Sequence, residues 1–330
     1  MTNSLYVDAN SRVILLPKSS ETSSYQLVDI PIPRDLSRTK PYLVNEGNDQ
    51  KTSIYDLSEV KNDNPYTVQD NVPVLKNGDP VKSFIFEASG EEGAVIQSGK
   101  VLVANKFDIT WLLISIFYSK DQFTKNFITV EDVMDKLAAI FSQNDKWVHT
   151  LSDQCYSESL VKICESIVEN REMFYKFSIE KTFEFVKNKV ELLREFIAKG
   201  ENSIITNIKG KLTDKTAAIQ DIPETILALM ILRYSVDFVC DSYVGSKFKK
   251  EFLTYTKYDF TELDNYLTEL QDKQKNLQVV EANMNAVAQS SAQTSSKKKK
   301  EDSKKKTTLK KVVKKVAVGK GALDGFFKKA

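Results

Sequence analysis

Residues 174–200 read FYKFSIEKTFEFVKNKVELLREFIAKG, and this stretch decides how the middle of the chain is interpreted. Its aromatic start, residues 174–177, predicts a short strand, and Ser178 is of a type that favours the N-cap of a helix. Gly200 stands where a glycine commonly ends a helix. Between them, apolar residues recur in steps of three and four; they are Phe183, Val186, Val190, Leu193 and Ile197. The segment therefore predicts a strand followed by a long amphipathic helix.

Shorter helices are expected before this segment. Asp108 is placed to cap an apolar helix, and Thr129 with Asp132 has the spacing of a capping box that opens a second helix. A third helix is expected over Glu158–Val168. Short helices followed by a small strand and a longer helix are typical of a winged-helix-like module.

The first hundred residues indicate β-structure, because short apolar runs alternate there with clusters of turn-forming residues. The expected strands are Ser4–Val7, Arg12–Leu16, Tyr25–Ile32, Tyr42–Val44, Ser53–Leu57, Val81–Glu87, Ala94–Gln97 and Val101–Ala104. Regular spacing of this kind favours a small barrel or sandwich. The strands are short for a self-contained core, and proteins normally cover open sheet edges. We therefore expect another chain to complete the sheet.

After the long helix, Pro223 begins a strongly apolar helical segment, and large apolar residues become rare beyond Gln271. The overall prediction is an α+β chain. Residues 1–105 form a β-barrel-like domain shared with a partner, and residues 106–270 form a helical, winged-helix-like domain. Residues 271–316 form a disordered lysine-rich linker, and residues 317–330 form a short binding peptide.

The charge of the chain is distributed unevenly. There are 47 Lys and Arg against 45 Asp and Glu, a net of +2, but residues 291–330 contain 14 lysines and three acids. The tail thus carries +11 and the remaining 290 residues carry −9. The long helix 179–199 has five bases and four acids, which gives little attraction to phosphate. A protein-packing module is therefore favoured, and a DNA-binding winged-helix protein of transcription or chromatin is the alternative.

The inventory of reactive side chains is poor. His149 is the single histidine, and no serine or cysteine lies in a nucleophile motif or in a metal-ligand spacing. We expect no catalytic residue, no metal site and no cofactor in this chain. The three cysteines suggest a reducing compartment. No apolar run approaches the roughly 20 residues of a membrane span, and the start lacks a signal-peptide pattern, so no membrane association is expected.

The lysine-rich tail contains spaced basic clusters. The candidate residues are Lys297, Lys298, Lys299, Lys300, Lys304, Lys305 and Lys306. A nuclear import signal, and hence a nuclear location, is our first interpretation. A DNA-contacting arm and a solubilising tail are the other two, and the three do not exclude one another.

The last residues carry an apolar motif. Leu323, Phe326 and Phe327 lie at spacings of three and four, so one helical turn would place all three on one side. Such a trio is suited to a hydrophobic groove, and the flanking lysines would favour an acidic rim. This peptide resembles a PIP-box, the motif by which proteins bind the replication sliding clamp, with Lys320 where the pattern has Gln.

Other segments extend the resemblance. Three segments are similar to segments of the B-subunit family of eukaryotic ribonuclease H2. They are Phe174–Thr182 with Lys189-Val190, Ser98–Ala104 running into Phe107–Leu113, and Leu232–Tyr234 through Asp241–Val244. The order of parts also matches over nearly the whole chain.

The resemblance implies a non-catalytic subunit of a heterotrimer, with an N-terminal triple barrel shared with the C subunit. It implies that the A subunit holds the catalytic carboxylates and Mg, cleaves the RNA of RNA–DNA hybrids and removes single ribonucleotides misincorporated in DNA. The chain is then expected to bring the complex to the sliding clamp PCNA as well as to support the A subunit. Contact with nucleic acid is expected only through the complex, in ribonucleotide excision repair and DNA replication.

Overall fold

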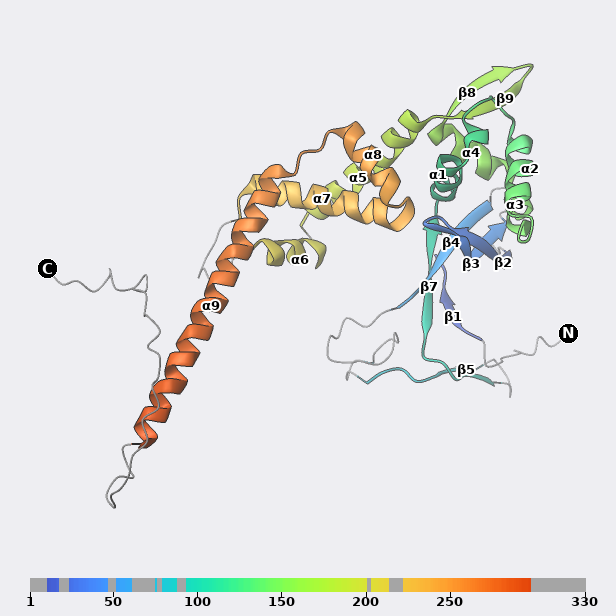
Figure 1. Ribbon diagram of the computed structural model, residues 1–330. Helices are drawn as coiled ribbons and strands as arrows, with labels where there is room; N and C mark the ends of the chain where they lie inside the picture. Colours follow the sequence, from blue (N-terminus) through green and yellow to red (C-terminus); the bar gives the residue numbers. More distant parts are fainter. Residues whose placement is uncertain are drawn as a thin grey trace, which may run out of the picture. The chain divides into compact units, whose positions relative to one another are not determined.

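The computed structural model describes residues 11–17, 24–46, 52–60, 75, 79–87, 93–200, 203–213 and 222–297. Contacts along the chain divide it into two units, Met1–Leu270 and Gln271–Ala330. The first unit combines a β-sheet with a helical module (Figure 1). The predicted strand Ser4–Val7 lies outside the described residues.

The N-terminal strands form one five-stranded sheet in the order β1-β7-β4-β3-β2. These strands are β1 (Val13–Leu15), β2 (Ser24–Ile32), β3 (Asp35–Glu46), β4 (Thr52–Glu59) and β7 (Val101–Phe107). Strands β1 and β7 are parallel, and the other pairs are antiparallel. In the described part of the chain, β1 and β2 are the edges of this sheet, so it does not close on itself.

A separate hairpin joins β5 (Phe84–Glu87) to β6 (Gly93–Ile96). Its cross-strand pair Ile85 and Val95 is exposed. Between β6 and β7 the backbone at Gly99 runs close to residue 81, since a Cβ at Gly99 would lie 1.8 Å from the Val81 carbonyl oxygen. Only glycine fits this approach.

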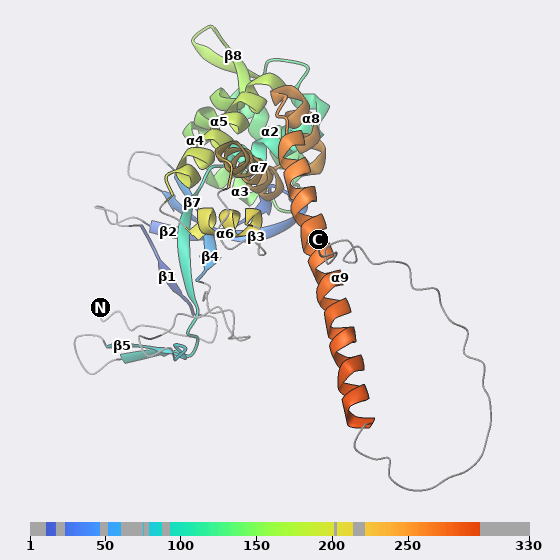
Figure 2. The same ribbon diagram turned by 90° about the vertical axis from the view of Figure 1, so that its left-hand side faces the viewer.

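The helical module begins directly after β7. Its first part contains α1 (Thr110–Ser119), a short 3₁₀ turn η1 (Asp121–Phe123), α2 (Val130–Ile140), α3 (Lys146–Thr150) and α4 (Asp153–Ile163). The hairpin β8 (Cys164–Glu169) and β9 (Glu172–Phe177) follows, and Ile128 forms an isolated bridge to Tyr175 of β9. Helices followed by a hairpin that takes up one more strand form a winged helix, with β8–β9 as its wing (Figures 1 and 2).

The second part of the module is entirely helical. It contains α5 (Ile179–Ala198), α6 (Ser203–Leu212), α7 (Glu224–Tyr243), α8 (Ser246–Thr256) and the start of α9 (Thr261–Lys297). Ser178 caps α5 by accepting a hydrogen bond from the Lys181 amide, and Gly200 follows this helix with a φ of +78°, as the sequence predicted. The capping box of Thr129 and Asp132 is also present at α2.

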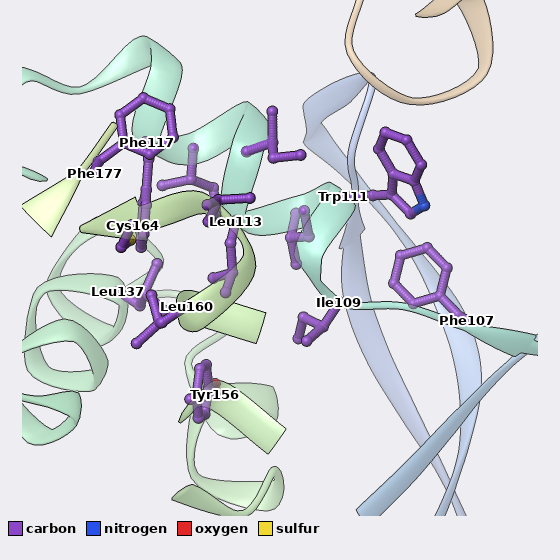
Figure 3. Close-up of a cluster of buried hydrophobic side chains, with 14 of the residues drawn as sticks. Phe107, Ile109, Trp111, Leu113, Phe117, Leu137, Tyr156, Leu160, Cys164 and Phe177 are labelled. Atoms are coloured by element: carbon purple, nitrogen blue, oxygen red, sulfur yellow. The ribbon is translucent and has the colours of Figure 1, made fainter. Parts of the chain in front are cut away.

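One core joins the sheet to the helices. Helix α1 is buried on nearly all sides and packs against Leu137, Tyr156, Leu160, Cys164 and Phe177 of the winged helix (Figure 3). Tyr42 and Phe107 of the sheet belong to the same cluster, with ring centroids 4.8 Å apart. A second cluster lies between α5, α6, α7 and the beginning of α9.

Two predicted boundaries are wrong. The expected helix Glu158–Val168 ends at Ile163, and residues 164–169 form strand β8 instead. The β-branched Ile167 and Val168 favour a strand, and positive φ angles at Asn170 and Arg171 close a tight hairpin behind them. Residues 271–297, expected to be disordered, continue helix α9. Their Gln, Lys, Glu, Leu and Ala residues favour a helix even where few side chains are buried.

Candidate interaction surfaces

The winged helix has a surface that in DNA-binding proteins of this shape faces the duplex. The second helix of a helix-turn-helix pair enters the major groove, and here that place belongs to α4. Its exposed face carries Gln154, Glu158 and Val161, and Gln154 donates a hydrogen bond to Glu158. The one basic residue of α4, Lys162, is paired with Asp108. Helix α4, which the structure describes in full, therefore has no free cation to offer phosphate.

The wing, like α4, has no net positive charge. Its strands and turn contain three glutamates, Glu165, Glu169 and Glu172, against two bases, Arg171 and Lys176. Apolar side chains at Ile167, Val168 and Met173 are exposed on it. Acidic and apolar residues together suit a protein surface better than a polyanion. In this fold α4 and the wing, and not the long helix α5, form the surface that would face a duplex.

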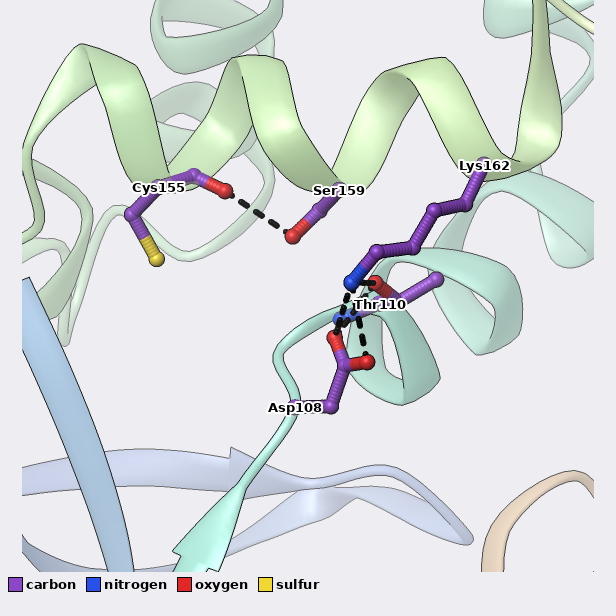
Figure 4. A network of polar contacts seen from close by, with 5 residues as sticks. All are labelled: Asp108, Thr110, Cys155, Ser159 and Lys162. Carbon is purple, nitrogen blue, oxygen red and sulfur yellow. Dashed lines mark hydrogen bonds and ion pairs between the residues drawn. The ribbon is translucent and has the colours of Figure 1, made fainter. Parts of the chain in front are cut away.

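A polar network fixes α4 to the end of β7 (Figure 4). Asp108 accepts hydrogen bonds from the Thr110 amide at 3.1 Å and the Thr110 hydroxyl at 2.5 Å, and Lys162 Nζ lies 2.9 Å from Asp108 Oδ2. Burial raises the pKa of Asp108, but the bonds from Thr110 and Lys162 outweigh it and hold that pKa below its ordinary value. The prediction that Asp108 caps this helix is wrong, because Ile109 is the N-cap residue of α1 and Asp108 instead forms a turn with Thr110 just before the helix.

Two more bonds tie the module to the sheet. The Ser152 amide at the start of α4 donates to Thr52 Oγ1 of β4 at 3.1 Å, and Asn144 donates to the Asp29 carbonyl oxygen of β2 at 3.2 Å. No sequence pattern indicated the pairing of Asp108 with Lys162, because 54 residues separate them.

A cavity of about 390 Å³ lies beside this network, between β4, β7 and α4. Cys155 and Ser159 line it, and the Ser159 hydroxyl donates to the Cys155 carbonyl oxygen (Figure 4). Burial, together with the nearby Asp108 and Glu158, raises the pKa of the Cys155 thiol to about 11. The thiol is therefore protonated near neutral pH and is a poor nucleophile.

The other reactive residues are dispersed. His149 is exposed on α3, next to the buried Trp147 and Val148. Burial raises the pKa of Cys164 and of Cys240 to about 12. Within the described ranges, no group of three or more His, Cys, Asp or Glu could hold a metal ion. Among the described helices, none combines the length and the hydropathy that a transmembrane span requires.

The N-terminal β-rich part of the chain has exposed apolar side chains. They include Leu15 and Leu16 at and after β1, Leu27 in β2, and Ile85 and Val95 in the β5–β6 hairpin. Open edges at β1 and β2 accompany them. Uncovered apolar strands of this kind mark a protein interface.

The predicted tail residues lie outside the described residues. This applies to the clamp-binding candidates Lys320, Leu323, Phe326 and Phe327, and to the basic candidates from Lys298 to Lys306. Lys297 is the last described residue of α9, and nothing is stated of its side chain.

Both parts of the first unit match domain models of one protein family. A model of the Ydr279p protein triple barrel domain matches residues 15–108, and a model of the wHTH domain of the Ydr279p protein family, an RNase H2 complex component, matches residues 111–253. The chain belongs to the Ydr279p family. The predicted order, a triple barrel followed by a winged-helix domain, is thereby confirmed.

A curated relative agrees over the full length. The chain is 26% identical to the B subunit of ribonuclease H2 from Saccharomyces cerevisiae, with 98% of each chain covered. This chain is accordingly a non-catalytic component of the RNase H2 complex. The exposed apolar strands and the acidic, apolar wing are in keeping with a subunit that binds other proteins.

Proposed function

We propose that this chain acts as the B subunit of a heterotrimeric ribonuclease H2, where it supports the catalytic A subunit together with the C subunit. The A subunit would cleave the RNA of RNA–DNA hybrids, remove single misincorporated ribonucleotides and carry the Mg ions. The observation that carries this proposal is the match of two consecutive domains to one family of complex components. The open sheet with exposed apolar strands supports a barrel completed by the C subunit.

Reconstitution tests this assignment. The purified chain alone should leave a ribonucleotide-containing duplex intact, and the three subunits together should cut it. Omitting this chain should abolish assembly of an active complex. Hydrolysis by the chain alone, or full activity of the A and C subunits without it, would contradict the proposal.

We further propose that the C-terminal peptide brings the complex to the sliding clamp PCNA, with Leu323, Phe326 and Phe327 as anchors and Lys320 at the position of the usual Gln. Burial of an apolar side chain of this size contributes about 1.5–3 kcal/mol before the ordering of the peptide is subtracted. The motif supports a contact of micromolar strength or weaker.

The double change Phe326→Ala with Phe327→Ala should abolish measurable binding of the complex to the clamp, as followed by surface plasmon resonance. Trimer assembly and cleavage of free duplex should remain unchanged. Val312→Ala with Val313→Ala is the matched control, because it removes apolar groups from the same tail outside residues 317–330. Unchanged clamp binding in the phenylalanine variant would refute this role.

We also propose a nuclear location directed by the lysine clusters at 297–300 and 304–306. Replacing these seven lysines with Gln should move a fluorescent fusion of the full chain out of the nucleus. Persistence of the nuclear signal in cells without the other subunits would assign import to another feature of the chain.

The alternative, a DNA-binding winged-helix protein of transcription or chromatin, is disfavoured by the charges on α4 and the wing. It predicts that residues Phe127–Lys199 bind duplex DNA with a sequence preference and a steep dependence on salt. The B-subunit proposal predicts weak binding with no sequence preference.

A further inference from the structure

The wing has a free strand edge. Asn170 and Arg171 form a two-residue turn with positive φ, so Glu169 and Glu172 are a hydrogen-bonded pair. Hydrogen-bonded and non-bonded pairs alternate along an antiparallel ladder, so Glu165 and Ile167 also bond to β9. The backbone groups of Ser166 and Val168 therefore point to the other side of β8, where no described strand pairs with them.

The base of this edge is already occupied. The Cys164 amide donates to the Leu160 carbonyl oxygen, and the Cys164 carbonyl oxygen accepts from Lys181 Nζ at 2.8 Å. The free edge is thus confined to Ser166 and Val168. It can hold a short extended segment through at most two residue pairs.

The outer face of β8 has a simple chemical pattern. Side chains alternate along a strand, so Glu165, Ile167 and Glu169 lie on one face, reading acidic, apolar, acidic. Ile167 is 42% exposed. Residues opposite these three on an added strand would occupy non-hydrogen-bonded positions, where side chains approach most closely. The matching pattern on that strand is basic, apolar, basic.

A cavity at the foot of the wing is also lined mainly by acidic residues among its charged groups. It has a volume of about 370 Å³ and is lined by Asp121, Glu165 and Glu180, with Lys176 as its one basic residue. Lys176 also lies over the Phe127 ring, 5.8 Å from its centroid, and Ser178 donates a hydrogen bond to Glu180. Phe117 and Phe177 form part of the wall. Such a cavity suits the stem and cation of a long basic side chain.

We propose that β8 is a docking edge for an extended segment of a partner protein in which two basic residues flank an apolar one at alternate positions. The segment adds as a third strand on Ser166 and Val168, its apolar side chain covers Ile167, and its basic side chains meet Glu165 and Glu169. The basic residue nearest Glu165 reaches the cavity at the foot of the wing. This docking edge uses other residues than the proposed clamp peptide and the N-terminal sheet.

The test uses the full chain and a short labelled peptide with Lys-Thr-Val-Thr-Lys at its centre. Binding is measured by fluorescence anisotropy, and amide hydrogen exchange locates the site. The peptide should slow exchange at the Ser166 and Val168 amides. A peptide with N-methylated threonines keeps its charge but loses the strand donors, and it should bind at least about tenfold more weakly. Charge reversal to Glu-Thr-Val-Thr-Glu should abolish binding.

Matched variants of the chain separate this edge from acidity in general. Glu165→Gln with Glu169→Gln should weaken binding about tenfold, since two cross-strand charge pairs are lost. Glu131→Gln with Asp135→Asn removes the same charge from exposed positions of α2 and should leave binding unchanged. Thermal unfolding of both variants verifies that the fold is kept.

Three results would overturn the proposal. The first is equal weakening by the wing and α2 variants, which would mean that only net charge matters. The second is equal binding of the methylated and unmethylated peptides, which would exclude strand addition. The third is displacement of the peptide by an RNA–DNA hybrid, which would make a nucleic acid the occupant of this surface.

Discussion

The helical module and the N-terminal β-rich region differ in how far they bury isoleucine side chains. Ile114 of α1 is completely buried among residues of the module, whereas Ile85 of the β5–β6 hairpin is 72% exposed. The module covers its own apolar residues, whereas the β5–β6 hairpin exposes them and the five-stranded sheet has open edges at β1 and β2 among the described strands. The module thus buries its own core, and the exposed β-rich part is the part that the proposed barrel with the C subunit would cover.

The largest expected effect compares these two isoleucines directly. Ile114→Ala should lower the free energy of unfolding by about 2–5 kcal/mol, because it leaves a cavity in a packed core. Ile85→Ala should change it by less than about 0.5 kcal/mol. Urea denaturation of the full chain measures both.

The exposed isoleucine should matter in the complex even though it contributes little to the stability of the isolated chain. Ile85→Ala should weaken association with the C subunit, as followed by analytical ultracentrifugation, if the hairpin belongs to the shared barrel. A large loss of stability of the isolated chain on Ile85→Ala would mean that this hairpin is covered within the chain itself.

A smaller effect is expected inside the module, at the start of α2. Thr129→Ala removes the acceptor of the Asp132 amide and half of the capping box, so it should cost about 1 kcal/mol. Thr129→Ser keeps the hydroxyl and is the control. Thermal unfolding of the two variants should separate them, and equal stability would show that the cap contributes nothing.

Local signals in the sequence accounted for much of the module. The Ser178 cap, the apolar steps of α5 and Gly200 all act within one helix, so their pattern is visible in the chain itself. The same holds for Thr129 and Asp132. Residue order also sufficed to predict the β-rich start and the winged-helix-like middle, which the family matches confirm.

The failures arose where distant contacts decide the outcome. Residues 164–168 have apolar spacing compatible with a helix, but pairing with β9 makes them a strand. The length of α9 was missed because a loss of large apolar residues was interpreted as a loss of helix, although burial and helix propensity are separate properties. The link between Asp108 and Lys162 depends on how α4 packs, which no local pattern encodes.

The smallest expected effect concerns that link, which joins the sheet to the module. The folded-state pKa of Asp108 lies below its ordinary value of 3.8, so its carboxylate stabilises the fold above that value. This contribution is lost as pH falls through the lower, folded-state pKa. Since both partners are partly exposed to solvent, we expect only about 0.5–1 kcal/mol.

Asp108→Asn should therefore be less stable than the native chain near about pH 6, and the difference should shrink as the pH is lowered toward about 3. Urea denaturation across this range measures the difference, with Asp135→Asn as the control for loss of one exposed carboxylate. A difference that stays constant with pH would mean that the Asp108 charge contributes nothing and that Thr110 alone holds the turn. The sheet and the module would then be joined by packing and neutral hydrogen bonds.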